Sequence, residues 1–213
     1  MSRVVMINGS PKKSGSASGA IIGELERIAG RTFAQYHAMS LFRNESFEPV
    51  LQADAIVIVF PLYVDALPSQ LLRLLTRLEN PLKQTSGRKL MLFAICNCGF
   101  YEGAQTKTAL AILRNFADRA GLRWGYGLGI GCGGYLGGVK DASKGPTANV
   151  HAALREFAAK IESTDGVPLD DEFVQLDDVF VQPMMPRFLY RLGGHIGWRK
   201  MAKANGAKIN MIH

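Results

Sequence analysis

The sequence predicts an α/β fold in which a parallel β-sheet carries helices on both faces. The first observation is the alternation of strand-like and helix-like apolar patterns between residues 3 and 161. The second is the run AIVIVF at 55–60, which is apolar throughout, as a parallel strand covered on both faces should be. The third is the composition, because 213 residues with 47% hydrophobic and 20% charged residues can bury a sizeable core.

The N-terminal elements follow from apolar periodicity. Residues 3–7 are a short run rich in β-branched residues, which predicts a buried strand. A loop rich in Gly, Ser and Pro at 8–18 precedes a helical pattern that extends to Ile28. A second strand is expected at 32–38, and the run at 55–60 is the third strand.

The second half of the domain continues the same alternation. Apolar residues spaced for one helix face predict helices at 67–78, 105–120 and 148–161. The apolar runs at 89–95 and 124–130 predict the fourth and fifth strands. Five parallel strands joined by helices suit the doubly wound strand order 2-1-3-4-5, with helices in a layer on either side of the sheet.

The predicted fifth strand is unusual because glycine alternates with larger residues in WGYGLGIG. Such a strand has one nearly bare face, so a neighbouring segment can approach its backbone closely. A glycine-rich loop at 131–145 follows.

Beyond residue 162 the alternation stops, and the charge becomes segregated. The chain has 25 Lys and Arg against 18 Asp and Glu, a net charge of +7. Residues 162–178 carry seven acids and no base, whereas residues 179–213 carry six bases and no acid. This pattern predicts a domain at 1–162 and an extension at 163–213, an acidic linker followed by a basic helical tail. Pairing of its halves with complementary surfaces would make the tail a cap or a dimer arm. Residues 173–182 are expected to be extended, and one or two short helices interrupted by Gly193-Gly194 are expected at 187–204.

Several classes of protein are excluded or disfavoured. No run of about 18 apolar residues is present, so a membrane span is not expected. The N-terminus lacks the long apolar region of a signal peptide, which favours a cytoplasmic protein. The three cysteines, an odd number, are then expected as thiols. A nucleic-acid binder would show one continuous basic face, so RNA or membrane-surface binding through residues 187–208 is only a minor alternative.

Ligands of such sheets bind at the carboxyl ends of the strands where the strand order reverses, which singles out three loops. The loop GSPKKSGSAS at 9–18 combines hydroxyls, lysines and glycines before a helix, a combination typical of an anion site. It is neither a Walker A loop nor a G-x-G-x-x-G loop. The alternative is a solvated loop in which Ser16 or Ser18 is the N-cap of the helix.

The other two loops suit a planar ring. In FPLYVDALPS at 60–69, Tyr63 and Val64 offer apolar surface for stacking, although a rigid turn with a half-buried tyrosine is the alternative. In CNCGFYEG at 96–103, glycines permit close backbone approach, and Asn97 has both a donor and an acceptor. The Cys-x-Cys pair lacks the further ligands of a metal site, so no metal is expected and small residues ending a strand are the alternative.

Together these loops resemble those of the flavodoxin-like NAD(P)H-dependent FMN reductases. Their pattern is a strand ending in G-S-P-[RK]-x-x-[SG]-[NS]-[TS], then P-x-Y-x-x-x-x-P, then a loop of small residues. The resemblance covers about residues 1–162 and implies a flavodoxin-like, three-layer sandwich. The tail FLYRLGGHIGWRKMAKANG is similar to the C-terminal extension of some bacterial flavodoxin-family oxidoreductases.

The resemblance implies a role for twelve residues. The residues implied to hold the FMN phosphate, with Lys12 beside it, are Ser10, Ser16, Ala17 and Ser18. Those implied to flank the isoalloxazine are Pro61, Leu62, Tyr63 and Val64. Those implied to approach its pyrimidine edge are Asn97, Cys98 and Gly99. Many relatives have Asn-Thr where this chain has Ser16-Ala17, so one side-chain donor to the phosphate is missing.

The implied activity is that of an oxidoreductase that uses FMN and NAD(P)H to reduce a small acceptor such as a quinone, flavin, azo or nitro compound. No side chain is expected to be catalytic, because the flavin supplies the chemistry. Tyr63, Asn97 and Tyr135 are the candidates for contact with the ring or substrate. Related reductases often complete the site from a second subunit, so a homodimer is expected. The alternatives are a flavodoxin-like electron carrier, which would usually be acidic, and a flavin-free interaction module of the same fold.

Overall fold

The structure is a computed structural model, which describes residues 3–43, 46–85, 90–136, 142–163 and 176–207. The chain divides into two compact units, Met1–Pro183 and Met184–His213. This division lies later in the chain than residue 162, because a further strand joins the first unit. Each unit is described by itself.

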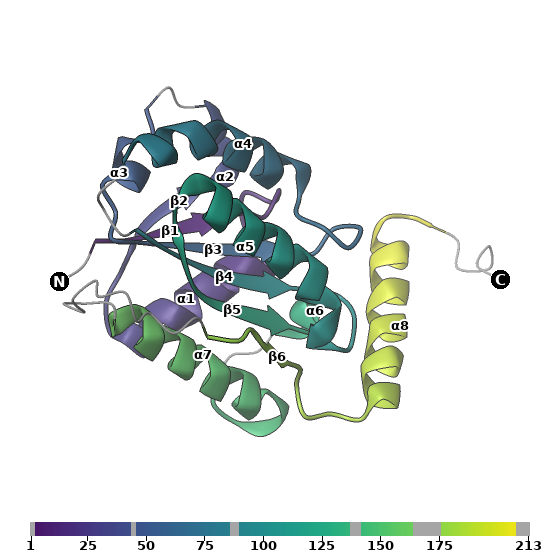
Figure 1. Cartoon of the computed structure of the whole chain (residues 1–213). Coiled ribbons are helices and arrows are strands. Elements are labelled where there is room, and N and C mark those ends of the chain that lie inside the picture. Colours follow the sequence, from purple (N-terminus) through teal and green to yellow (C-terminus); the bar gives the residue numbers. More distant parts are fainter. Residues whose placement is uncertain (1–2, 44–45, 86–89, 137–141, 164–175, 208–213) are drawn as a thin grey trace. The chain divides into compact units, whose positions relative to one another are not determined.

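The first unit is built on a parallel sheet with the expected order β2-β1-β3-β4-β5, extended by β6 (Figure 1). The strands are β1 (Val4–Asn8), β2 (Ala34–His37), β3 (Ala55–Pro61), β4 (Met91–Asn97), β5 (Arg123–Ile130) and β6 (Val179–Val181). The sheet therefore has six strands where five were expected. The sixth comes from the segment that was expected to be extended, and it pairs in parallel with β5.

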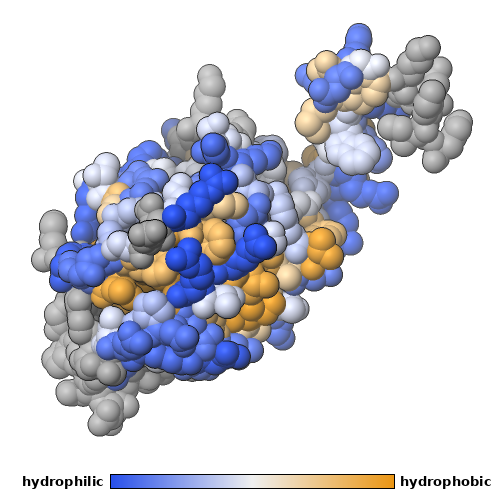
Figure 2. Space-filling view, turned by 90° about the horizontal axis from the view of Figure 1, so that it is seen from above, coloured by the Kyte–Doolittle hydropathy of each residue, from blue (hydrophilic) through white to orange (hydrophobic). Residues whose placement is uncertain are grey.

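Helices form a layer on each side of this sheet, which confirms the predicted three-layer sandwich (Figure 1). One side carries α2 (Ala38–Arg43), α4 (Ser69–Gln84) and α5 (Lys107–Ala120), and the other carries α1 (Ala17–Ala29) and α7 (Ala148–Glu162). Short helices complete the connections: α3 (Glu48–Leu51), η1 (Gly103–Thr106), α6 (Gly133–Leu136) and η2 (Gly145–Thr147). Viewed from the α4 side, the surface mixes hydrophilic side chains with smaller apolar areas (Figure 2).

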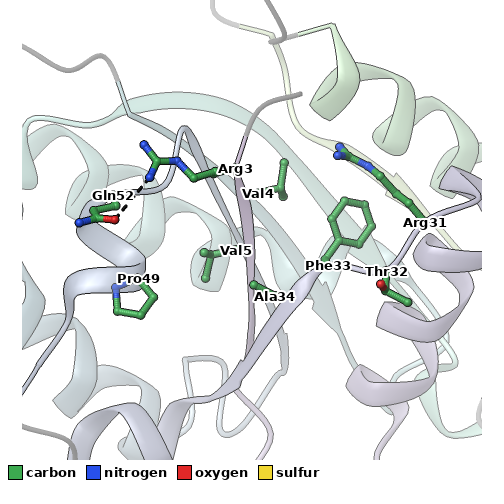
Figure 3. A pocket seen from close by; sticks show the side chains of 9 residues that line it. All are labelled: Arg3, Val4, Val5, Arg31, Thr32, Phe33, Ala34, Pro49 and Gln52. Carbon is green, nitrogen blue, oxygen red and sulfur yellow. Dashed lines mark hydrogen bonds between the residues drawn. The ribbon is translucent and has the colours of Figure 1, made fainter.

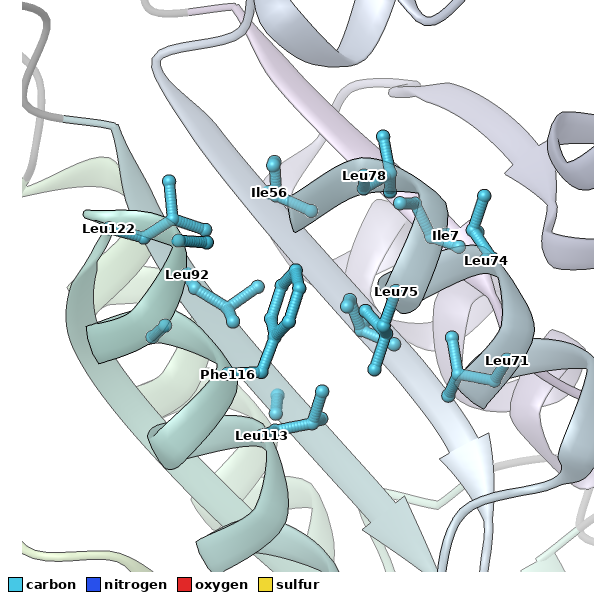
Figure 4. Close-up of a cluster of buried hydrophobic side chains, with 14 of the residues drawn as sticks. Ile7, Ile56, Leu71, Leu74, Leu75, Leu78, Leu92, Leu113, Phe116 and Leu122 are labelled. Carbon is cyan, nitrogen blue, oxygen red and sulfur yellow. The ribbon is translucent and has the colours of Figure 1, made fainter. Parts of the chain in front are cut away.

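The core lies in two layers because successive residues of a strand point to opposite faces. In β3, Ile56, Ile58 and Phe60 belong to the layer under α4 and α5, which Figure 4 shows from close by. Val57 and Val59 belong to the layer against α1 and α7. Both faces of the sheet are thus apolar, which is why the central strands read as uninterrupted hydrophobic runs.

The glycines of β5 provide the close approach that the sequence predicts. A Cβ at Gly127 would lie 2.3 Å from the Asp178 carboxylate, and one at Gly129 would lie 2.1 Å from Thr106 Oγ1 and 2.6 Å from the Phe180 ring. The side chains of Asp178 and Phe180, together with Thr106 of η1, therefore cover the bare face of β5.

An acid from the charge-segregated region anchors this packing. The Asp178 carboxylate pairs with Arg114 at 2.8 Å and accepts a hydrogen bond from the indole N–H of Trp124 at 3.0 Å. These two partners lie on α5 and β5. The expected acids at 165, 170, 171 and 172 lie outside the described residues, so the pairing of the acidic linker with the tail stays a prediction.

The second unit contains one helix, α8 (Arg187–Ala204), which continues through Gly193-Gly194. The expected interruption at this glycine pair is absent from the helix. Exposed apolar side chains run along it, namely Phe188, Leu189, Leu192, Ile196, Trp198 and Met201. No helix of the described part of the chain is long and apolar enough to cross a bilayer.

Candidate functional site

The loop between β1 and α1 is shaped by its own polar side chains. Asn8 Oδ1 accepts a hydrogen bond from the Ser10 N–H at 3.0 Å, and Ser10 Oγ accepts one from the Lys12 N–H at 3.2 Å. Ser16 is the N-cap of α1, and its Oγ accepts from the Gly19 N–H at 3.0 Å. Of the two residues expected as the N-cap, Ser16 takes that position.

This loop has the properties that a phosphate site requires. Lys12, Ser14 and Gly15 are exposed, and the first turn of α1 contains no acidic residue. The first N–H groups of a helix have no partner within the helix, and the helix dipole adds partial positive charge there. An exposed loop with lysines, leading to a helix N-terminus without acids, fits a phosphate group.

The turn after β3 places two side chains outward in an unusual backbone conformation. Tyr63 and Ala66 exchange two backbone hydrogen bonds, with N···O distances of 2.9 and 3.0 Å. Between them, Val64 and Asp65 have φ angles of +49° and +58°. A β-branched residue at positive φ is rare and strained by about 1–3 kcal/mol. Val64 is nevertheless 98% exposed, and Tyr63 is 44% exposed.

Asn97, the last residue of β4, ties three loops together from a buried position. Its Nδ2 donates to Ser18 Oγ in α1 and to the Phe60 carbonyl in β3, both at 3.0 Å. Its backbone carbonyl accepts from the Leu62 N–H at 2.7 Å. Because both amide hydrogens are used inside the protein, Asn97 acts here as a clamp. Any side-chain hydrogen bond from Asn97 to a flavin edge would therefore use Oδ1.

The loops after β4 and β5 are joined in the same way by backbone hydrogen bonds. The Cys98 N–H donates to the Ile130 carbonyl, the Cys132 N–H to the Phe100 carbonyl and the Gly133 N–H to the Cys98 carbonyl, at 2.9, 2.7 and 2.7 Å. A Cβ at Gly133 would lie 2.9 Å from Asn97 Oδ1, so glycine permits this approach. The carboxyl edge of the sheet is therefore a set of loops held in place before any ligand binds.

The three cysteines are free and buried at this edge. Burial raises the pKa of the Cys132 thiol to about 11, and it also raises the pKa of Cys96 and Cys98. All three are protonated at neutral pH, so none is a ready nucleophile. Among the residues that the structure describes, no cluster of His, Cys, Asp and Glu could hold a metal ion.

Exposed apolar side chains gather where the strands end. In the described part of the first unit, Tyr63 and Val64 follow β3, Phe100 follows β4 and Tyr135 follows β5. Apolar groups left exposed beside a rigid polar loop are typical of a site for a planar ligand. Phe100 was not predicted as a site residue, although it lies in the CNCGFYEG loop, where an aromatic residue among small ones was the available signal.

The predicted site residues divide into two groups in the structure. Five are buried, at 4%, 8%, 1%, 3% and 3% exposure: Ser10, Ser16, Ser18, Asn97 and Cys98. Ser18 is also hydrogen-bonded to Asn97. The more accessible ones are Lys12, Ala17, Pro61, Leu62, Tyr63, Val64 and Gly99. The contacts of all twelve with a flavin stay predictions.

A hollow of about 300 Å³ lies at the other end of the strands and is shown in Figure 3. It is lined by residues that include Arg3, Arg31 and Phe33. The Arg31 guanidinium lies over the Phe33 ring, with Cζ 4.8 Å from the ring centroid. The Arg3 guanidinium donates a hydrogen bond to Gln52 Oε1. Because this hollow adjoins the amino end of β1, it is not at the edge where sheets of this type bind ligands.

Solved structures with similar folds include the WrbA-like flavodoxin from Agrobacterium tumefaciens, with 12% identity, a TM-score of 0.55, and coverage of 78% of this chain and 98% of that chain. FerB, a flavoenzyme NAD(P)H:(acceptor) oxidoreductase from Paracoccus denitrificans, has 15% identity, a TM-score of 0.54 and the same coverage. The apo form of the NADH:FMN oxidoreductase EMOB has 13% identity and a TM-score of 0.54, and the match covers 83% of this chain and 95% of that chain.

No family model matches the sequence, and neither does any curated protein. At identities this low, the structural likeness is one of fold. The strand order and the helix layers show that the first unit of this chain has a flavodoxin-like fold.

Proposed function

We propose that the protein is an FMN-dependent oxidoreductase that takes hydride from NAD(P)H and reduces a small acceptor, such as a quinone, flavin, azo or nitro compound. The observation that carries the proposal is the juxtaposition at one sheet edge of an exposed, lysine-bearing loop and a group of exposed aromatic side chains. A nucleotide with a phosphate at one end and a planar ring at the other needs both. The oxidoreductases among the structural neighbours support the same reaction class.

The bound flavin would supply the redox chemistry, accepting hydride from NAD(P)H and passing electrons to the acceptor. The chain's own residues would bind and orient it. Backbone N–H groups of residues 14–18 and the Lys12 ammonium would hold the phosphate. Tyr63, Phe100 and Tyr135 would offer flat apolar surface to the ring and exclude water from it. The Asn97 clamp would keep the loops at a fixed separation, so little conformational freedom would be lost on binding.

The decisive experiment is the visible spectrum of the purified full chain, before and after incubation with FMN. We expect flavin bands that NADH or NADPH bleaches under anaerobic conditions without a partner protein. Bands that resist both nucleotides would overturn the reductase proposal in favour of an electron carrier. A chain that binds no FMN would overturn both flavin-dependent functions and favour the flavin-free interaction module.

The phosphate loop is tested separately by comparing FMN with riboflavin. Because the two ligands differ only in the phosphate, FMN should bind at least about tenfold more tightly. Lys12→Ala should weaken FMN binding and leave riboflavin binding unchanged. Arg73→Ala, which removes an exposed cation from α4, is the matched control. Equal affinity for the two ligands would refute the phosphate site.

The expected homodimer and cytoplasmic location belong to this proposal as further predictions. Light scattering of the full chain measures the oligomeric state. The tail would act as a dimer arm if a chain that ends at Pro183 is monomeric while the full chain is dimeric. Retention of the dimer without residues 184–213 would contradict that role.

A further inference from the structure

A second ligand site is suggested on the outer side of the phosphate loop. A hollow of about 350 Å³ lies between that loop, the carboxyl end of β2, α2 and the start of α4. Its polar lining consists of Lys13, His37, Ser40, Arg43 and Gln70. The volume lies within the range of small-molecule sites.

The charges of this hollow are of one sign. The described residues of its lining include two permanent cations, Lys13 and Arg43, and no acid. Within the described parts of the chain, neither cation forms an ion pair. Elsewhere on the same unit, Arg27, Lys83 and Arg119 each lie within 3.0 Å of a glutamate. Two cations that line one hollow without an ion pair to any described residue, with a hydroxyl and an amide beside them, suit an anion.

His37 connects this hollow to the phosphate loop. Its Nδ1 accepts a hydrogen bond from the Met39 N–H at 3.3 Å, which leaves the hydrogen on Nε2. Nε2 lies 3.3 Å from the Lys12 carbonyl and donates to it. The imidazole therefore joins the start of α2 to the loop that would hold the flavin phosphate. A ligand in the hollow would lie beside the bound flavin.

The chemistry of the lining distinguishes the two nicotinamide donors. NADPH carries a phosphate on its adenosine ribose where NADH carries a hydroxyl. Proteins that select NADH commonly place a carboxylate at that hydroxyl, and those that select NADPH place an arginine at the phosphate. Among the residues that the structure describes, this hollow offers Arg43 and Lys13 and no carboxylate, while Pro11 and Met39 add apolar lining.

We propose that this hollow binds the 2′-phosphate of NADPH and makes NADPH the preferred donor, an inference that rests on the proposed reductase function. Arg43 would be the specificity-determining residue, with Lys13 and Ser40 completing the phosphate contacts. The site uses residues of the β1–α1 loop, β2, α2 and α4, separate from the exposed apolar side chains that would hold the flavin ring.

Binding of nucleotide fragments tests the hollow without any turnover. Titration calorimetry on the FMN-treated full chain compares 2′,5′-ADP, 5′-AMP and inorganic phosphate. We expect 2′,5′-ADP to bind at least about tenfold more tightly than 5′-AMP, since it adds one charge-assisted phosphate contact. Arg43→Ala should abolish the preference, whereas Arg43→Lys should retain part of it.

Arg73→Ala is the matched control, because Arg73 lies on the neighbouring α4 and does not line the hollow. Equal affinity for the two adenosine nucleotides would overturn the proposal. So would an equal loss of affinity in Arg73→Ala, since that would indicate only the general positive field. Inorganic phosphate binding as tightly as 2′,5′-ADP would also overturn it, because the site would then recognise a free anion.

Steady-state kinetics complete the test. The ratio of kcat/KM for NADPH to that for NADH should fall at least about tenfold in Arg43→Ala, with FMN affinity unchanged. An unchanged ratio in an active reductase would overturn this proposal and leave the reductase function intact. Selective 2′,5′-ADP binding by a chain that takes up no FMN would support the hollow and overturn the reductase function instead.

Discussion

Replacing Asn97 by alanine should loosen the edge of the sheet at which the flavin is proposed to bind. The Asn97 side chain is 3% exposed, and its two amide hydrogens are donated to Ser18 Oγ and the Phe60 carbonyl, both at 3.0 Å. Alanine removes both hydrogen bonds, so the buried Ser18 hydroxyl and Phe60 carbonyl each lose a hydrogen-bond donor. The residue thus links α1, β3 and β4 through a single side chain.

The magnitude follows from these two contacts. Losing one partner of a buried hydrogen bond costs about 1–3 kcal/mol, and the Ser18 hydroxyl can rotate to recover part of its share. We therefore expect Asn97→Ala to lower the free energy of unfolding by about 3 kcal/mol. In a chain of this size, that loss corresponds to a fall in Tm of roughly 6–12 °C. Affinity for FMN should fall as well, because the loops would no longer be held in place.

The assay is urea unfolding of the wild type, Asn97→Ala, Ser18→Ala and the double variant. The double-mutant cycle should give a coupling energy of about 1 kcal/mol, since Ser18 shares only one of the two hydrogen bonds. Asn80→Ala, at an exposed position of α4, should change stability by less than about 0.5 kcal/mol. A loss below about 0.5 kcal/mol in Asn97→Ala, or zero coupling to Ser18, would refute the clamp.

Further substitutions and titrations test other parts of the structure. Gly129→Ala places a Cβ 2.1 Å from a hydroxyl oxygen and should cost about 1–3 kcal/mol in urea unfolding, whereas Gly23→Ala, with open space on α1, should be neutral or stabilising. The hydrogen bond from Arg27 lowers the pKa of Glu24 from 4.5, so its stabilisation is present above that pH and is lost as the pH falls further. Glu24→Gln should therefore flatten the acid side of the stability profile, and an unchanged profile would contradict this. With the pKa of Cys132 raised to about 11, the buried thiols should react with iodoacetamide at pH 8 only after unfolding, and rapid labelling of the folded chain would be inconsistent with their burial.

Much of the fold could be predicted from local pattern. The five expected strands, the order in which they pair and the helices on both faces follow from apolar periodicity and from the alternation of elements. The close approach to the glycine face of β5 could also be predicted, because a strand with a glycine at every second position needs a close neighbour on that side. The sequence did not predict which segment would be that neighbour.

Contacts between distant segments account for what the pattern did not predict. β6 has only three residues, Val179–Val181, and joins the sheet because Asp178 and Phe180 fit the bare face of β5. In α8, glycines that normally weaken a helix were expected to interrupt it, yet the helix is continuous. For β6 the local propensity is weak, so its place in the sheet depends on residues far away in the sequence.

For the candidate site too, some features follow from the sequence and others only from the tertiary structure. The sequence by itself determined which loops lie at the carboxyl edge, because strand order and loop composition are properties of the chain. It also narrowed the N-cap of the first helix to Ser16 or Ser18, of which the structure has Ser16. Only the tertiary structure decided that Asn97 bonds to Ser18, that the turn at Val64 has positive φ, and that Arg43 shares a hollow with Lys13. Residues that are tens of positions apart meet only when the layers pack, and the resulting distances and exposures carry the chemistry.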